Sequence, residues 1–329
     1  MTLTAGRSLQ DLMRALRPRN RLAEYCELRD DAGLFPQFAA VYAGIRPAMD
    51  CWIPNRNRDA FVRFVEELGL SQRADCAFRR LAGERLEKAV GGETLCTTKA
   101  EGIPLRDAGP DDEVHFFVGR GSSGAARLQE TGWYPVVVED RMFPKPFIDH
   151  LEFGRRLGYP ECCISFFADC NDWNRTNSYF EASRRTVRFR HLANCFGKNA
   201  GFSMNFHLPC RFDCRATIRQ SGRLMEYLMR EEPEYAAAAE RLLRMPVLAL
   251  NEREVIVLDG APADGGFAYS TAADLFSVPS DVMRAIEGGD RLEIHGRFIR
   301  VLRGRELVGV FECRTDEFGP RVPMLVTWQ

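Results

Sequence analysis

The sequence predicts an α+β protein with a mainly helical N-terminal region, a small βαβ core that continues into a Cys-rich helical segment, and a β-rich C-terminal domain. The chain has 329 residues, more than one hydrophobic core usually supports. Helical periodicity dominates its first and middle parts, whereas short apolar runs between glycine turns dominate its end. We therefore expect three regions, residues 1–110, 111–246 and 247–329.

The composition favours a globular protein without a strong overall electrostatic field. Hydrophobic residues make up 45% of the chain and charged residues 28%, which is enough apolar surface for a packed core. Since 45 Lys and Arg face 46 Asp and Glu, nothing steers the whole molecule toward nucleic acid or an anionic membrane. Arg7, Asp11 and Arg14 interrupt the stretch where a secretory signal needs apolar residues. We expect a cytoplasmic protein without membrane contact, in which stable disulfides are disfavoured.

The clearest helix of the first region covers residues 59–68. Asn57 is expected to cap its start and Gly69 to end it. Its apolar face consists of Phe61, Val62, Val65 and Leu68.

The core region begins with a strand, a glycine turn, a short helix and a second strand. The turn holds Gly119, Gly121 and Gly124 in a G-x-G-x-x-G string, and Glu139 and Asp140 end the second strand. That order is the context of the dinucleotide fingerprint, so the three glycines are candidates for cofactor binding through backbone N–H groups. The alternative is a glycine turn that binds no nucleotide. The third region combines short β-like runs with one helix at residues 280–286.

Cysteines cluster in the middle of the chain. Those between residues 162 and 214 are Cys162, Cys163, Cys170, Cys195, Cys210 and Cys214. Pro160 and Pro209 precede two of the groups, and each is expected to open a helix. Thiols in a first helical turn meet free N–H groups and partial positive charge, which lower the thiol pKa toward the thiolate that binds metals.

Two metal chemistries fit this cluster. Cys210 and Cys214 are four residues apart, so one helical face would present both sulfurs. The neighbouring Cys162 and Cys163 diverge by about 100° around a helix, so both serve one ion only if the backbone distorts. An iron–sulfur cluster relaxes that restriction and also uses the surplus thiol Cys195. The expected cluster ligands are Cys162, Cys163, Cys195, Cys210 and Cys214.

The alternative is a zinc ion. Its ligands would be His207, Cys210, Cys214 and one of the vicinal cysteines, a set that is structural when closed. His207 is also the candidate catalytic acid or base near the thiols. Cys170 is expected to pack in the core.

Two motifs carry a resemblance to a known family. Residues 158–163 read G-Y-P-E-C-C, and residues 207–214 read H-L-P-C-R-F-D-C. With these G-Y-P-x-C-C and H-x-P-C-x-x-x-C motifs, residues 113–225 resemble an uncharacterised Cys-rich archaeal and bacterial domain of unknown function. The vicinal cysteines are also loosely similar to those of the non-cubane cluster domains of heterodisulfide reductase. That similarity implies only that vicinal thiolates can ligate one cluster.

A basic run lies beside these motifs. Its members are Arg184, Arg185, Arg188, Arg190 and His191, and Arg211, Arg215, Arg219 and Arg223 extend it along the second motif. Arginines bind phosphates, so the run could recognise an anionic substrate; a solvated helix face is the alternative.

The leading hypothesis is a metal-dependent enzyme. Its iron–sulfur cluster would act on a small anionic or thiol-containing substrate. The alternatives are a zinc-stapled module that binds RNA or another polyanion, with nucleic acid less favoured, and a metal-free thiol redox protein.

Overall fold

The computed structural model describes most of the chain. The described residues are 8–80, 90–91, 94–95, 100–132, 136–138, 141–143, 149–173, 178–198, 200–250, 255–275, 280–313 and 323–329. They form two compact units, Pro18–Ile164 and the combination of Met1–Arg17 with Ser165–Gln329. Helices and antiparallel sheets occur in the chain, which confirms the α+β class. The division falls at other residues than the predicted boundaries near 110 and 246.

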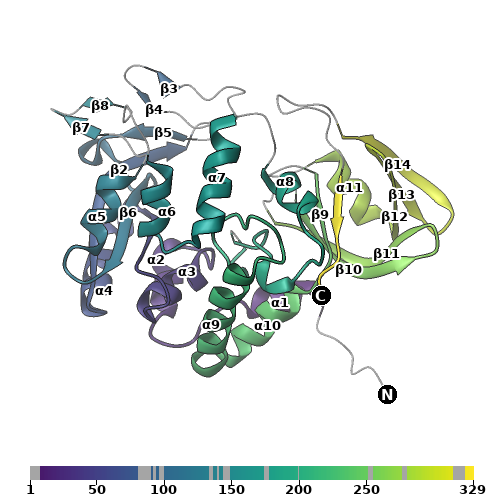
Figure 1. The fold of residues 1–329 in the computed structure, drawn as a ribbon, viewed down its shortest axis with the longest axis horizontal. Helices are drawn as coiled ribbons and strands as arrows, with labels where there is room; N and C mark the ends of the chain where they lie inside the picture. Colours follow the sequence, from purple (N-terminus) through teal and green to yellow (C-terminus); the bar gives the residue numbers. More distant parts are fainter. Residues whose placement is uncertain are drawn as a thin grey trace. The chain divides into compact units, whose positions relative to one another are not determined.

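The unit Pro18–Ile164 is built on an antiparallel sheet with the strand order β1-β6-β2-β5. Figure 1 labels β2, β5 and β6 of this sheet. Its strands are β1 (Ala48–Pro54), β2 (Leu70–Arg80), β5 (Ala100–Ile103) and β6 (Glu113–Arg120). These strands correct the expectation that residues 1–110 are mainly helical. β2 pairs with β6, which is distant in the sequence. This pairing determines the conformation of β2, whose own alternation of apolar and polar residues is weak.

The helices of this unit flank the sheet. They are α2 (Ala23–Arg29), α3 (Phe35–Tyr42), α4 (Arg58–Glu67), α5 (Gly124–Thr131) and α6 (His150–Arg156). Shorter elements are η1 (Asn55–Asn57), η2 (Leu105–Asp107), β3 (Val90–Gly91), β4 (Thr94–Leu95), β7 (Val136–Val138) and β8 (Arg141–Phe143). α4 confirms the helix predicted at 59–68, and Gly69 follows it with φ +70°. Asn57 does not cap it through its side chain; instead its Nδ2 donates to the Leu28 carbonyl at 2.9 Å.

The glycine turn between β6 and α5 has a steric explanation. A Cβ on Gly119 would lie 2.6 Å from the carbonyl carbon of Gly124, and Gly121 has φ +70°. β6 is antiparallel to both of its neighbours, and β7 pairs with β8, so the unit is not the parallel βαβ arrangement of the dinucleotide fingerprint. Glu139 and Asp140 lie outside the described residues. Nucleotide binding by these glycines stays a prediction.

The other unit combines helices with a β-rich C-terminal part. Its helices are α1 (Leu9–Ala15), α8 (Ser178–Arg184), η3 (His191–Ala193), α9 (Arg215–Glu231), α10 (Pro233–Leu243) and α11 (Asp281–Gly288), and α7 (Glu161–Trp173) contains the division. α11 matches the helix predicted at 280–286, and the Ser280 hydroxyl accepts a bond from the Met283 N–H at 3.1 Å. Within the described residues, no helix is both long and apolar enough to cross a membrane.

An antiparallel sheet of seven strands forms the predicted β-rich part (Figure 1). Its strands are β9 (Val247–Ala249), β10 (Val255–Ala263), β11 (Gly266–Asp274), β12 (Arg291–His295), β13 (Phe298–Arg303), β14 (Glu306–Glu312) and β15 (Met324–Val326). The last strand, β15, returns beside the first, β9. The chain then runs to Gln329, whose N–H donates to the Phe189 carbonyl at 2.8 Å. This return brings the end of the sequence to the Cys-rich segment.

Candidate functional site

The first thiol pair lies in the first turn of α7. The Pro160 carbonyl accepts bonds from the N–H groups of Cys163 at 2.9 Å and Ile164 at 3.0 Å, so the helix begins after this proline, as predicted. The sulfurs of Cys162 and Cys163 are 3.9 Å apart. The two sulfurs thus approach each other within the regular helix α7, without the backbone distortion that was expected for one ion to take both. Side chains in a helix lean toward its N-terminus, so their sulfurs can approach each other although the Cα–Cβ bonds diverge.

The second thiol pair lies in a turn and not on a helical face. α9 begins only at Arg215, with Cys214 at its N-cap, and the Cys214 N–H donates to the Arg211 carbonyl at 3.0 Å. The expectation that Pro209 opens a helix is therefore wrong. The reason is Phe212, which is fully buried and stacks on Phe189 with ring centroids 5.6 Å apart. Burying this ring holds the segment in a turn.

The four sulfurs of these pairs form one group. The Sγ atoms of Cys162, Cys163, Cys210 and Cys214 all lie within 4.8 Å of one another. Cys163 and Cys214 are buried, Cys210 is half-buried and Cys162 is exposed. Four thiols so close together can bind a metal ion. The convergence of the two motifs predicted from the sequence is thus confirmed.

Three of the four thiols lie at helix N-termini. Cys162 and Cys163 lie in the first turn of α7, and Cys214 is the N-cap of α9. Both positions adjoin the positive end of a helix dipole. Arg211, between the second pair, adds a fixed positive charge, and it is paired with Asp213 at 2.8 Å.

Two other predicted site residues lie outside the four-thiol group. Cys195 is buried, and desolvation raises the pKa of its thiol to about 12. The His207 ring is also buried, with Nε2 2.9 Å from the Thr217 hydroxyl oxygen. A catalytic role for His207 stays a prediction. Cys170 is buried, consistent with the packing role expected for it.

A further buried polar cluster has no signal in the sequence. His115 on β6 is fully buried, with Nδ1 2.8 Å from Asp75 Oδ1 and Nε2 3.5 Å from Asp50 Oδ2. Asp75 sits at an irregularity in β2, and Cys76 lies beside it. Burial lowers the pKa of His115, but hydrogen bonds to Asp50 and Asp75 outweigh it and the pKa is raised. Burial raises the pKa of the Cys76 thiol, so this sulfur stays protonated.

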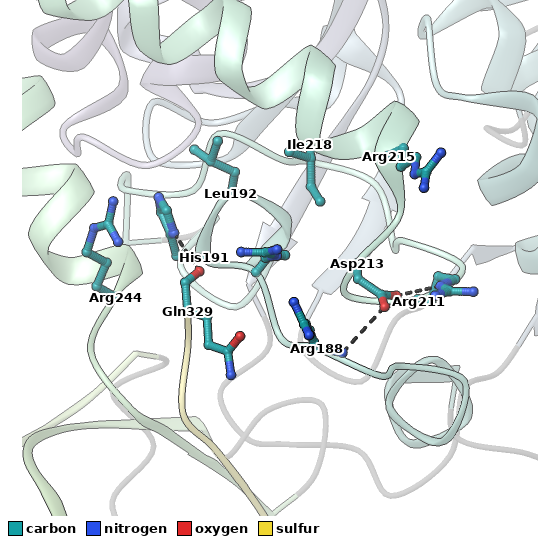
Figure 2. Close-up of a pocket in the computed structure, with 10 residues that line it drawn as sticks. Arg188, His191, Leu192, Arg211, Asp213, Arg215, Ile218, Arg244 and Gln329 are labelled. Carbon is teal, nitrogen blue, oxygen red and sulfur yellow. Dashed lines mark hydrogen bonds and ion pairs between the residues drawn. The ribbon is translucent and has the colours of Figure 1, made fainter.

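An arginine-rich pocket lies in the unit that contains α9, and it is lined by Arg211 and Asp213, which stand between the two cysteines of the second pair (Figure 2). Its volume is about 580 Å³, and we call it the arginine pocket. The residues that line it are Arg188, Arg190, His191, Leu192, Arg211, Asp213, Arg215, Ile218, Arg244 and Gln329. Four of its arginines belong to the basic run predicted from the sequence. Arg244 and Gln329 were not predicted to belong to this site, because only the folded chain brings them here.

Comparisons with protein-family models, with curated proteins and with solved structures find no match to this chain. The resemblance of residues 113–225 to a Cys-rich family therefore stays a prediction that rests on its two motifs. Any functional assignment depends on the chemistry of the side chains described above.

Proposed function

We propose that the chain is a metalloprotein in which one tetrahedrally coordinated metal ion, with zinc as the favoured metal, is held by Cys162, Cys163, Cys210 and Cys214. The compactness of the sulfur group supports this proposal. A Zn–S bond of about 2.3 Å gives a tetrahedron whose sulfurs are about 3.8 Å apart. The Cys162 and Cys163 sulfurs are 3.9 Å apart, and the whole group stays within 4.8 Å.

An iron–sulfur cluster, which the sequence favoured, fits this geometry less well. In a cluster with several irons the cysteine sulfurs bind different metal atoms, so they spread more widely than around one ion. The surplus thiol that favoured the cluster was Cys195, which is buried and has a raised pKa. The geometry therefore supports a mononuclear metal site better than an iron–sulfur cluster.

A structural role follows from the number of ligands. Four protein thiolates fill the coordination sphere of zinc, whereas catalytic zinc sites keep a position open for water or substrate. The bound ion would join the start of α7 to the turn before α9 and so stabilise the fold. We therefore propose a metal-stapled protein rather than an enzyme that reacts at the metal.

Metal analysis of the full-length protein, purified without oxygen, tests the proposal. We expect one zinc ion per chain and no acid-labile sulfide. Cobalt substitution should give the absorption bands of a tetrahedral tetrathiolate site. Cys162→Ser and Cys210→Ser should each lower the metal content, because each removes a ligand.

Cys170→Ser is the matched control, since Cys170 lies on the same helix as Cys162 but outside the sulfur group. It should keep the full metal content. Several irons per chain with matching sulfide would support the cluster and contradict the mononuclear ion. A native protein that binds neither zinc nor cobalt would contradict both.

A further inference from the structure

The arginine pocket concentrates positive charge in a chain that is almost neutral. The whole chain carries a formal net charge of -1, whereas five arginines and one aspartate line this pocket. Its volume of about 580 Å³ lies within the range of small-molecule sites, about 300–1,000 Å³. A concave site with one sign of charge raises the local concentration of ligands of the opposite sign.

Only some of these charges are neutralised by protein groups. Arg211 pairs with Asp213 at 2.8 Å, and Arg244 pairs with Glu240 at 2.8 Å. Among the residues that the structure describes, no carboxylate forms an ion pair with Arg188, Arg190 or Arg215. Three guanidinium groups that line one pocket without an ion-pair partner leave it positively charged, and a bound anion would offset that charge.

The walls of the pocket are held by hydrogen bonds. Asp213 Oδ2 accepts from the backbone N–H groups of Val187 at 3.3 Å and Arg188 at 3.4 Å. The Gln329 carbonyl accepts from the His191 backbone N–H at 3.2 Å, and it lies 2.9 Å from His191 Nδ1 (Figure 2). The segment that carries Arg188 is therefore fixed against the turn that carries Arg211.

We propose that the arginine pocket binds a small ligand that carries phosphate groups. The planar guanidinium group matches two oxygens of a phosphate at once, which makes arginine the usual residue for this anion. Leu192 and Ile218 lie on one side of the pocket and can contact an apolar part of the ligand (Figure 2).

A nucleic-acid strand fits the pocket less well. Proteins that bind single strands stack the bases on exposed aromatic rings. Here Phe189 stacks on Phe212, and Trp328 packs edge-on against both, with Phe212 and Trp328 centroids 5.5 Å apart. None of the three lines the pocket. Both kinds of ligand carry phosphate groups, and the pocket favours a small molecule over a nucleic-acid strand.

Calorimetric titration of the full-length protein with inorganic pyrophosphate at physiological salt tests the proposal. We expect saturable binding. Arg188→Gln, Arg190→Gln and Arg215→Gln should each weaken it about tenfold, because each removes a charged hydrogen-bond donor. Arg219→Gln and Arg223→Gln are matched controls on α9, outside the pocket, and should leave the affinity unchanged.

A single-stranded RNA oligonucleotide is the second probe. If RNA binds more tightly than pyrophosphate and the two control variants weaken it as much as the pocket variants, the small-ligand proposal is overturned in favour of an exposed basic stripe. Absence of pyrophosphate binding overturns it as well. If the purified native protein contains no metal yet binds pyrophosphate through Arg188, the mononuclear site is refuted and the pocket proposal stands.

Discussion

His115 is a buried titratable residue at the centre of the sheet in Pro18–Ile164. Its ring is 0% exposed and lies between Asp50 and Asp75, beside the protonated Cys76 thiol. Phe117 and Trp52 also contact it, with ring centroids 4.6 Å and 5.1 Å away. Carboxylates face both ring nitrogens and favour the charged imidazole, against the burial that disfavours it. The cluster therefore links β1, β2 and β6 through polar groups.

Replacement of His115 by Gln should make the stability of the protein less dependent on pH. A histidine whose pKa is raised on folding contributes its full stabilisation below its unfolded pKa, about 6.5, and loses it as the pH rises through the folded pKa. The raised pKa of His115 thus predicts a large loss on substitution in mild acid, about 3 kcal/mol, that shrinks in alkali. Denaturant unfolding across this pH range measures the difference.

His295→Gln is the control for this experiment, because His295 is 64% exposed and 3.6 Å from Glu293. It should change the free energy of unfolding little at any pH. A loss on His115 substitution that is equal at all pH values would show that the histidine is neutral in the fold.

Gly158 lies in the turn before α7, where both the backbone conformation and the surrounding atoms disfavour a side chain. Its φ is +74°, and a Cβ would lie 2.5 Å from Pro47 Cδ. Gly69 has φ +70° with nothing within 4 Å of such an atom. Gly158→Ala should therefore destabilise more than Gly69→Ala, which costs about 1 kcal/mol. Chemical denaturation of both variants tests this, and equal losses would exclude the steric contribution of Pro47.

At the level of elements, the start of α9 combines two roles in one residue. Cys214 is the helix N-cap and a member of the sulfur group, yet its side chain forms no capping bond. Serine at an N-cap accepts a bond from the helix N–H groups, which stabilises a helix by about 1 kcal/mol relative to alanine. The substitutions Cys214→Ser and Cys214→Ala therefore separate capping from metal binding.

Both variants should lose the metal, but Cys214→Ser should be more stable than Cys214→Ala. In the presence of a chelator, Cys214→Ser should be at least as stable as the wild-type protein. Thermal unfolding with and without chelator measures these differences. If chelator leaves the wild-type protein as stable as before, the ion does not stabilise the fold.

Local sequence signals predicted some elements and missed others for physical reasons. α4, the start of α7 and α11 were predictable because apolar spacing, a proline and a serine cap act within one or two turns. Pro209 carries the same local signal as Pro160, yet no helix begins directly after it, because Phe212 is buried against distant rings. A local pattern contains no information on such partners.

The same limit applies to the sites. The motifs around Cys162 and Cys210 predicted that the sulfurs converge, since cysteines in two such similar settings suggest a shared ligand. The arginine pocket needs Arg244 and Gln329 as well. Gln329 reaches it through the sheet order that returns β15 to β9, and Arg244 lies at the end of α10, which packs against α9. The buried His115 cluster is likewise assembled from three strands.

At the scale of the whole molecule, the sulfur group and the arginine pocket share one segment of the chain. Arg211 and Asp213 lie between Cys210 and Cys214, and Arg215 follows directly. Removal of the metal by a chelator should therefore weaken pyrophosphate binding, because the turn loses the ion that holds both of its ends. Calorimetry before and after chelation, with zinc added back, measures the change.

Restoration of the affinity by zinc is the control for damage by the chelator. Arg188→Gln should remain weak in either state. Equal pyrophosphate affinity with and without metal would show that the turn is held by Phe212 and the Asp213 hydrogen bonds alone.

The turn from Cys210 to Cys214 becomes a small closed ring once both sulfurs bind the same ion. A ring of this size has few conformations, so the side chains of Arg211 and Asp213 are ordered before any anion arrives. The incoming ligand then loses less configurational entropy, which is the advantage of a preorganised receptor over a flexible one. Calorimetry should therefore show that the metal-loaded protein binds pyrophosphate more tightly because the entropy of binding is less unfavourable, and not because new contacts form.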